Sequence, residues 1–470
     1  MAHQSAFSYS SSGTEPSISP QSSGINTPLE RPNPFGTPTM SSRNSWTSDS
    51  RCHSAAGAYL QSPEVDPRGL SNRYFRSRRV RKDQMESPKS LRNHKKKSIF
   101  QRQSWLIPCL GIFVGVGITG VLIYLGLQDQ KHAGKFCPVF MEDFSSGELS
   151  PNIWTAEQQV GGYGNGEFEQ TTDDPDVLFV KNGMLHIKPK LQDENLVAVD
   201  NSTIDLGASC TGTGWSSCFA FTNTTNGTIV PPVKSARINT KKGASIRYGR
   251  VEVTAKMPKG DWLWPAIWML PTDEVYGSWP ASGEIDIMET RGNNHTYKAG
   301  PGGGNNLLTS ALHWGPEHKL DKYLQTVNQL PALHEYYGDS FHTFGLEWTE
   351  DYIFTYVDSV LLQVLYVPLN KRFWDKGHFP AATVNGTALA DPWSHTGRLS
   401  TPFDQKFYLI LNVAVGGTNG YFRDNEAGKP WADASPVARK EFWQARDQWL
   451  PTWQKSGEMQ VKSVKMWEQC

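Results

Sequence analysis

Residues 283–289 read Gly-Glu-Ile-Asp-Ile-Met-Glu, and this stretch has the alternation of a half-buried β-strand. Its two isoleucines alternate with its first two acids, so the apolar side chains face a core and the carboxylates share the opposite face. Regular alternation would place position 288 beside the acids, but Met288 stands there. A one-residue bulge near Met288 would return Glu289 to the acidic face. The stretch therefore predicts a bulged strand that presents three carboxylates.

The three acids of this strand are Glu284, Asp286 and Glu289. Like charges on one strand face repel each other, so stability alone gives no reason to gather them. A glycosidase needs such a group, because one carboxylate attacks the sugar while another donates and then recovers a proton. A solvated edge strand with scattered acids is the alternative interpretation.

An aromatic-rich segment lies just upstream, where residues 260–271 read Gly-Asp-Trp-Leu-Trp-Pro-Ala-Ile-Trp-Met-Leu-Pro. Aromatic faces stack on sugar rings, which gives a cleft binding energy without strict hydrogen bonding. Tryptophan is also common in β cores, so packing explains any single one of the three more readily. Trp262 and Trp264, beside Asp261 in a loop-like setting, are the better candidates for a binding cleft.

Short β-rich runs separated by Gly, Asn, Asp and Pro turns fill the C-terminal two thirds of the chain. The clearest runs are residues 184–188, 247–257, 343–348, 352–357, 407–415 and 459–467. Long amphipathic helical runs are rare, and residues 436–450 form the best one. This pattern predicts an all-β sandwich or jelly roll, built as one domain.

Residues 105–127 carry no charged side chain and are long enough to cross a bilayer as a helix. Residues 73–102 hold 12 Lys and Arg against two acids, and positive flanks stay on the cytosolic side. We therefore expect residues 105–127 to be a transmembrane signal-anchor helix. Residues 1–104, rich in Ser and Pro, would be a disordered basic cytosolic tail. Residues 128–136 would be a short linker to an exported domain at 137–470.

The net charge supports this division of the chain. The whole sequence has 46 basic and 46 acidic residues, but residues 1–104 hold 16 and 7 of them, which leaves 30 and 39 for the rest. The overall balance excludes a uniformly basic nucleic-acid binder, and we expect no nucleic-acid partner. N-glycosylation sequons occur only after the apolar segment, at Asn201, Asn223, Asn226, Asn294 and Asn385. The expected location is the secretory pathway or the plasma membrane, with the large domain lumenal or extracellular.

Four cysteines follow the apolar segment: Cys137, Cys210, Cys218 and Cys470. They would lie on the exported side, where disulfides persist, and they allow three pairings. Cys210 and Cys218 close a short loop and are the first expected pair, while Cys137 and Cys470 could join the ends of the domain. No Cys-X-X-Cys or histidine cluster indicates zinc, and no catalytic metal is predicted.

Several segments together resemble glycoside hydrolase family 16, in particular its laminarinase-type members, the endo-β-1,3- and 1,3(4)-glucanases, and their invertebrate β-glucan recognition relatives. Residues 264–271 (Trp-Pro-Ala-Ile-Trp-Met-Leu-Pro) and 282–289 (Ser-Gly-Glu-Ile-Asp-Ile-Met-Glu) carry most of the resemblance. The Glu-X-Asp-X-X-Glu spacing is similar to the bulged laminarinase signature. Further matching segments are residues 164–167, 235–238, 248–252, 313–315, 341–348 and 409–417. They cover nearly all of the expected exported domain and none of residues 1–130.

The resemblance implies a concanavalin-like β-jelly roll with a concave glycan cleft and a retaining mechanism. Carried onto this sequence, Glu284 would be the nucleophile and Glu289 the general acid and then the base. Asp286 would sit between them and manage the charge of Glu284.

The same resemblance suggests further contacts. Asn165 and Arg237 match positions that hydrogen-bond sugars on the donor side, and His313 would lie near the acceptor side. A satisfied strand histidine explains His313 equally well. No cofactor is required, but the family often binds a structural calcium ion, for which Glu142 and Asp143 are the candidates.

Two functions follow from these expectations. The first is an enzyme that cleaves internal β-1,3 or mixed β-1,3/1,4 bonds of glucan, by hydrolysis or by transfer to another glucan, in cell-wall remodelling. The second is a non-catalytic β-glucan-binding recognition protein. Such relatives typically replace the acids, whereas Glu284, Asp286 and Glu289 are all present here.

Overall fold

The computed structural model describes residues 99–470 apart from 131–133, 299–302, 333–334 and 384–385. The expected disordered tail lies outside the described residues, except for its last few positions. Helix α1 (Ile99–Gln130) contains the apolar span Trp105–Gly126, which is long and apolar enough to cross a membrane. Because α1 reaches Gln130 and the first strand begins at Phe136, the linker is shorter than the expected 128–136.

The first sheet has the strand order β19-β18-β17-β12-β21-β5-β4. Strand β1 pairs with residues 464–469 of β21, and β5 pairs with residues 459–461 of the same strand. All pairings in this sheet are antiparallel. Its strands are β1 (Phe136–Glu142), β4 (Leu178–Lys181), β5 (Met184–Ile187), β12 (Gly249–Lys256), β17 (His342–Trp348), β18 (Tyr352–Val357), β19 (Ser359–Pro368) and β21 (Met459–Gln469).

The second sheet has the order β16-β15-β14-β13-β20-β10-β2, and β11 pairs with β20. It is also antiparallel, and it contains the acidic strand β14 near its centre. Its strands are β2 (Thr155–Ala156), β10 (Arg237–Asn239), β11 (Ser245–Ile246), β13 (Leu263–Pro271), β14 (Glu284–Glu289), β15 (Leu307–His313), β16 (Val327–Pro331) and β20 (Phe407–Val415).

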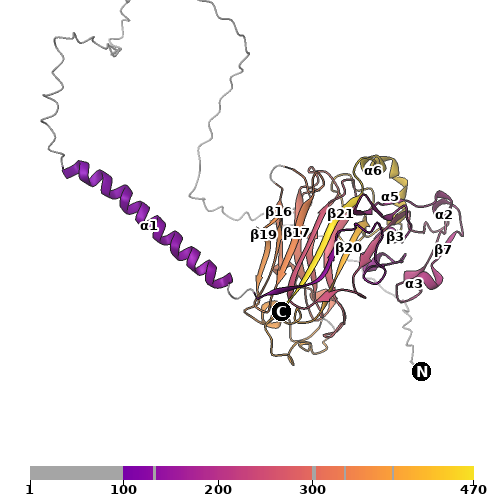
Figure 1. The fold of residues 1–470 in the computed structure, drawn as a ribbon. Coiled ribbons are helices and arrows are strands. Elements are labelled where there is room, and N and C mark those ends of the chain that lie inside the picture. Colours follow the sequence, from indigo (N-terminus) through magenta and orange to yellow (C-terminus); the bar gives the residue numbers. More distant parts are fainter. Residues whose placement is uncertain (1–98, 131–133, 299–302, 333–334, 384–385) are drawn as a thin grey trace, which may run out of the picture. The chain divides into compact units, whose positions relative to one another are not determined.

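Both sheets contribute to one hydrophobic core, which makes the fold an all-β sandwich of the predicted jelly-roll type (Figure 1). Strand β12 buries every second residue, as the period-two pattern of residues 247–257 predicts. Trp348 of β17 and Phe407 of β20 meet edge to face with ring centroids 5.4 Å apart, so the core joins the two sheets directly. Strand β20 is buried along its whole length, as expected for a strand at the middle of a sandwich.

The predicted helix at 436–450 is two helices, α5 (Ala438–Gln444) and α6 (Arg446–Trp453), which meet at Ala445. The remaining elements are short. They are η2 (Gly162–Gly164), β3 (Glu169–Thr171), β6 (Lys190–Leu191), α2 (Glu194–Ala198), β7 (Thr203–Asp205), η3 (Gly207–Ser209), α3 (Trp215–Cys218), β8 (Phe219–Phe221), β9 (Val233–Ser235), η4 (His318–Leu320), η5 (Tyr323–Gln325) and α4 (Phe373–Gly377).

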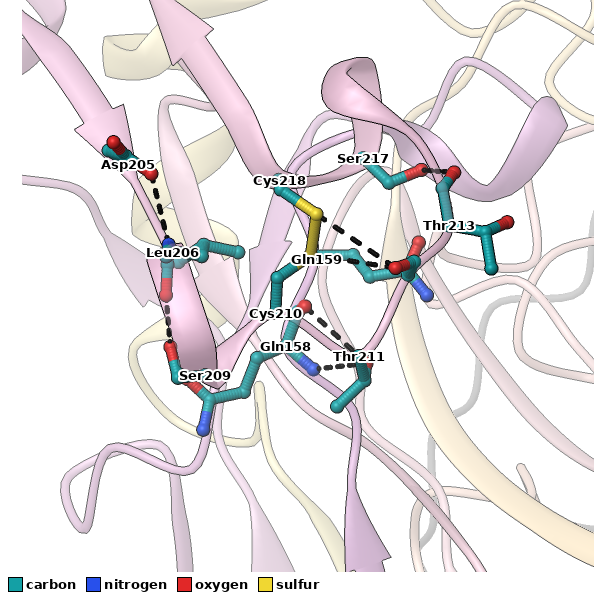
Figure 2. Close-up of a disulfide and its surroundings, with 12 residues drawn as sticks. Gln158, Gln159, Asp205, Leu206, Ser209, Cys210, Thr211, Thr213, Ser217 and Cys218 are labelled. Atoms are coloured by element: carbon teal, nitrogen blue, oxygen red, sulfur yellow. Dashed lines mark hydrogen bonds between the residues drawn. A yellow bond between two sulfur atoms is a disulfide. The ribbon is translucent and has the colours of Figure 1, made fainter. Parts of the chain in front are cut away.

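Both expected disulfides are confirmed. Cys137 joins Cys470, so the first and last strands of the domain are linked across 333 residues of sequence. Cys210 joins Cys218 and closes a short loop beside the β7–β8 hairpin (Figure 2).

Candidate active site

The predicted bulge in β14 is present. Against β13, Trp268 pairs with Asp286 and Ile267 pairs with Met288, so Ile287 is the extra residue. The pairing with β15 shifts at the same place, between Asp286 and Glu289. The bulge turns Glu289 back toward the acidic face, so all three acids lie together while the isoleucines enter the core.

Two tryptophan indoles hold the two glutamates separately. Trp279 Nε1 donates to Glu284 Oε2 at 2.9 Å, and Trp264 Nε1 donates to Glu289 Oε1 at 2.8 Å. Burial, and then the nearby charge of Asp286, raise the pKa of Glu284 to about 8 and that of Glu289 to about 7. The two carboxyls therefore retain protons at a pH where an exposed glutamate is ionised.

His313 supplies a positive charge next to Asp286 and Glu284. Its Nδ1 lies 2.6 Å from Asp321 Oδ2, and its Nε2 lies 3.2 Å from Asp286 Oδ2 and 3.8 Å from Glu284 Oε1. Burial alone would lower the pKa of His313, but Asp286 and Asp321 outweigh it and raise this pKa well above its usual range. His313 is therefore an imidazolium that lowers the pKa of Glu284 and so opposes the effect of burial.

Glu284 and Glu289 line a cleft of about 1590 Å³. Asp286 is 3% exposed and does not line it, so its charge acts from behind the two glutamates. Trp264, Trp268 and Trp279 also line this cleft. The cleft thus combines an acidic centre with aromatic walls, which is the combination expected for a site that binds sugar rings.

Trp262 corrects one expectation, because it lies in the core and not in the cleft. It is 3% exposed, and its ring meets Phe422 and Trp431 edge to face at 5.5 and 5.1 Å. Strand alternation alone would place Trp262 on the same face as Trp264. Strand β13 begins only at Leu263, however, and a left-handed φ of 69° turns the chain at Trp262.

Trp264 lines the cleft as expected, but it lies within a strand and not in a loop. Tyr421 covers one face of its indole, with centroids 3.8 Å apart and planes 8° apart. The Arg291 guanidinium lies 4.1 Å from the centre of the Tyr421 ring. This stack fixes the indole whose N–H holds Glu289.

Arg237 and Asn165 also line the cleft. Arg237 lies over the rings of Tyr163 and Trp268, at 4.2 and 4.6 Å, and pairs with Glu157 at 3.1 Å. These contacts hold the guanidinium at the cleft wall, where the Glu157 carboxylate balances its charge.

Asn165 is held from both sides. Its Nδ2 donates to Glu167 Oε1 at 2.9 Å, and its Oδ1 accepts from Asn419 Nδ2 at 3.0 Å. Burial raises the pKa of Glu167 and of the adjacent Glu169. Asn165 therefore rests on a buried acidic pair, which holds it at the edge of the cleft.

Sequence reasoning missed Trp279, Tyr421, Arg291 and Asp321. Trp279 lies in the connection between β13 and β14, where no periodicity indicates which way a side chain points. The spacing of Trp264 and Trp268 could have identified Trp268, because residues four apart on a strand share a face. Only the fold brings Tyr421 and Arg291 together.

The two places where a metal ion could bind differ in the ligand atoms that their side chains offer. Glu284, Asp286 and His313 offer ligand atoms within 4.8 Å of one another, but an imidazolium has no free lone pair for a metal. Glu142 Oε1 and Asp143 Oδ1 accept the backbone N–H groups of Phe144 and Ser145. Within the described ranges no third acidic or histidine side chain joins these two, so calcium there would depend on carbonyl or water ligands.

Comparison with known proteins agrees with the family resemblance of the sequence. Residues 203–396 match the family described as Glycosyl hydrolases family 16. A beta-1,3-glucan-binding protein of Penaeus monodon is 42% identical over 350 residues, which cover 71% of this chain and 90% of that protein. Glucan endo-1,3-beta-glucosidase A1 of Niallia circulans is 30% identical over 287 residues, which cover 59% of this chain and 34% of that enzyme.

Among solved structures, the catalytic domain of an endo-1,3-beta-glucanase (laminarinase) from Thermotoga petrophila RKU-1 is similar, at 24% identity and a TM-score of 0.45. It aligns with 72% of this chain and 99% of its own. The likeness to the Penaeus monodon protein extends over nearly the whole of that relative and includes the strand that carries the three acids. The chain therefore belongs to glycosyl hydrolase family 16.

Proposed function

We propose that the cleft binds β-1,3-glucan and cleaves its internal β-1,3 or mixed β-1,3/1,4 bonds by a double displacement. The observation that supports this proposal is the arrangement of two glutamates in the cleft with Asp286 buried behind them. Each glutamate accepts an N–H from its own indole, so the two carboxyls are held in place independently of each other.

In the first step the Glu284 carboxylate attacks the anomeric carbon while Glu289 gives its proton to the departing glycosidic oxygen. This leaves a glycosyl ester on Glu284 and a carboxylate at Glu289. In the second step Glu289 takes a proton from water or from a sugar hydroxyl, whose oxygen attacks the anomeric carbon and releases Glu284. Water yields hydrolysis and a sugar hydroxyl yields a longer glucan, so the same intermediate permits both outcomes.

The reactive protonation state has one proton on the glutamate pair. The mechanism requires this proton on Glu289, whose pKa of about 7, raised by burial and Asp286, suits a general acid near neutral pH. Glu284 must be ionised, and the His313 imidazolium together with the Trp279 N–H favours its charged form. The pKa of Glu284, about 8, still lies above that of Glu289, about 7, so the reactive form is the less populated of the two singly protonated forms. The assignment of Glu289 as acid and Glu284 as nucleophile therefore rests on the family resemblance of the Glu-X-Asp-X-X-Glu strand.

A second candidate function is recognition of β-1,3-glucan without turnover. The name of the Penaeus monodon relative, a beta-1,3-glucan-binding protein, favours it. Retention of Glu284, Asp286 and Glu289, each with its own partners, favours the enzyme.

We also propose that the chain crosses a membrane once and exports its family 16 domain toward wall glucan. Three features support this: the apolar span Trp105–Gly126, the basic flank at residues 73–102, and two disulfides in the domain that follows. Protease added to intact cells should cleave an epitope attached after Cys470 and leave one attached before residue 1 intact. The reverse pattern would contradict the orientation.

One experiment separates the enzyme from the binding protein. Wild type and Glu284→Gln are offered laminarin and barley β-glucan, and new reducing ends, longer chains and retained binding are measured. The enzyme proposal expects products from wild type, and binding without products from Glu284→Gln. Binding without products from wild type would favour recognition, while normal turnover by Glu284→Gln would refute the assignment of the nucleophile.

A further inference from the structure

A small lobe stands beside the cleft and takes no part in the mechanism above. It contains the β7–β8 hairpin, helix α3 and the Cys210–Cys218 disulfide. Ile204 of the hairpin packs in a hydrophobic cluster with residues outside these elements, namely Val160, Val197, Ile229, Val230 and Trp443 of α5. The lobe is therefore packed against the rest of the domain and can hold a surface in place.

Trp215, the first residue of α3, is 65% exposed. Its ring stacks on Phe219 with centroids 4.7 Å apart and planes 30° apart, so one face is supported and the other faces solvent. The disulfide closes the nine-residue loop that carries Trp215, which limits the motion of the ring. Exposing an indole to water costs free energy. The disulfide-closed loop holds Trp215 in this exposed position, so the stability of the fold does not explain the arrangement.

The loop that carries Trp215 is bonded to the segment that leads into the cleft. Thr211 N–H donates to Gln158 O at 3.1 Å, and Gln158 N–H donates to Thr211 Oγ1 at 2.9 Å (Figure 2). Val160 N–H donates to Ser217 O at 2.9 Å. A Cβ placed on Gly161 would lie 3.1 Å from Ser216 O, so α3 packs directly on this backbone.

Only Gly162 separates Gly161 from Tyr163, which lines the cleft. Trp215 precedes Ser216, which touches Gly161. The loop that carries the exposed indole thus packs on the backbone that leads to the cleft wall at its Asn165 end, the end that the family resemblance matches to the donor side.

The chemistry around Trp215 narrows the choice of ligand. Residues 206–233 contain no Asp, Glu, Lys or Arg, and many of them are Ser, Thr, Asn or Gly. The one charged residue in residues 203–233 is the exposed Asp205, which pairs with Phe219, so an anionic lipid headgroup would find no cation in this stretch and would be repelled. A neutral polymer of sugars would find an aromatic face and hydroxyl groups, which together suit the apolar faces and hydroxyl edges of its rings.

We propose that Trp215 forms an auxiliary glucan-binding site, which holds a β-glucan chain where it leaves the donor end of the cleft. The proposal rests on the proposed function, because it takes the same polymer as ligand. A chain that spans both places gains affinity from the second contact, whereas a short oligosaccharide that fills only the cleft does not. The site would therefore select long glucans.

The test compares Trp215→Ala with Tyr366→Ala in the full-length chain that also carries Glu284→Gln, so that turnover does not consume the ligand. Tyr366 is a matched control, since it is 55% exposed and stacks on Tyr352 with centroids 6.3 Å apart on a strand of the other sheet. The proteins are enzymatically deglycosylated first, because sequons at Asn223 and Asn226 lie in the same lobe. Dissociation constants are measured calorimetrically for laminarin and for a short β-1,3-gluco-oligosaccharide.

We expect Trp215→Ala to weaken laminarin binding by about tenfold, the effect of losing one aromatic contact, and to leave the oligosaccharide unchanged. Tyr366→Ala should change neither dissociation constant. Unchanged laminarin binding by Trp215→Ala would overturn the auxiliary site while the cleft assignment stands. Equal weakening for both ligands would also overturn it, because that result places the effect in the cleft. If the parent protein binds neither ligand, the proposed function itself fails.

Discussion

Replacing Glu289 with glutamine should stabilise the folded protein at neutral pH while it removes catalysis. Burial, and then Asp286, raise the Glu289 pKa from 4.5 to about 7, so the folded state disfavours the charged carboxylate. Glutamine keeps an oxygen that can accept the Trp264 N–H at the same place. The substitution therefore removes the titration and the catalytic proton with little change of shape.

The size of the effect follows from proton linkage. Below pH 4.5 the carboxyl is protonated in the folded and the unfolded chain alike, so stability there does not depend on its titration. As pH rises toward about 7, the unfolded chain loses the proton and the folded chain keeps it, so wild-type stability falls relative to the variant. At about 1.4 kcal/mol per pH unit, the difference reaches roughly 3 kcal/mol, an upper figure because water reaches Glu289 through the cleft.

The assay is urea unfolding of the full chain in mild detergent, followed by tryptophan fluorescence at several pH values between about 4 and 8. The stability difference between Glu289→Gln and wild type should grow with pH and level off near neutrality. Glu148→Gln, at an exposed position, serves as the control and should show no such growth. A difference that stays flat with pH would show that the folded state does not hold a proton on Glu289.

Three further predictions concern the same domain. The pH dependence of kcat/KM on laminarin should be bell-shaped with its maximum between about 7 and 8, because the raised pKa values of Glu289 and Glu284 make the singly protonated pair most abundant there; a plateau down to pH 5 would contradict it. Trp279→Phe should lower kcat/KM by about 10- to 100-fold, since Glu284 loses a hydrogen bond to its charged form; an unchanged initial rate would count against that role. Replacing Cys137 and Cys470 with serine should cost on the order of 3–5 kcal/mol of unfolding free energy, seen as a lower urea midpoint, because the bond closes a loop of 333 residues. An unchanged midpoint would show that the bond does not constrain the unfolded chain.

The acidic strand was predictable in detail because two local rules act on it at once. Alternation assigns the isoleucines to the core, and the count of residues before Glu289 requires one bulge. The structure has that bulge at Ile287 and Met288. Strand β20 was equally predictable, since eight of the nine residues at 407–415, all but Asn412, are apolar and favour a buried strand.

The aromatic walls were harder to predict because they depend on contacts between distant segments. Trp262 and Trp264 have the same sequence pattern, yet a backbone turn sends one to the core and leaves the other in the cleft. Trp279 lies in a connection without periodicity, and Tyr421 reaches Trp264 from more than 150 residues away along the chain. Local sequence patterns carry no information on such pairs. The three acids could therefore be predicted from the sequence, whereas the aromatic residues that contact them could not.

In the proposed mechanism Glu284 forms a covalent bond to the sugar, and a 2-deoxy-2-fluoro β-1,3-glucosyl substrate should trap that bond. The fluorine slows both steps, and a good leaving group restores the first, so the glycosyl ester accumulates. Peptide mass mapping of the labelled full-length chain should find the added sugar on Glu284 and no label in Glu284→Gln. Turnover of laminarin without any such label, or a label on Glu289 in place of Glu284, would exclude Glu284 as the nucleophile.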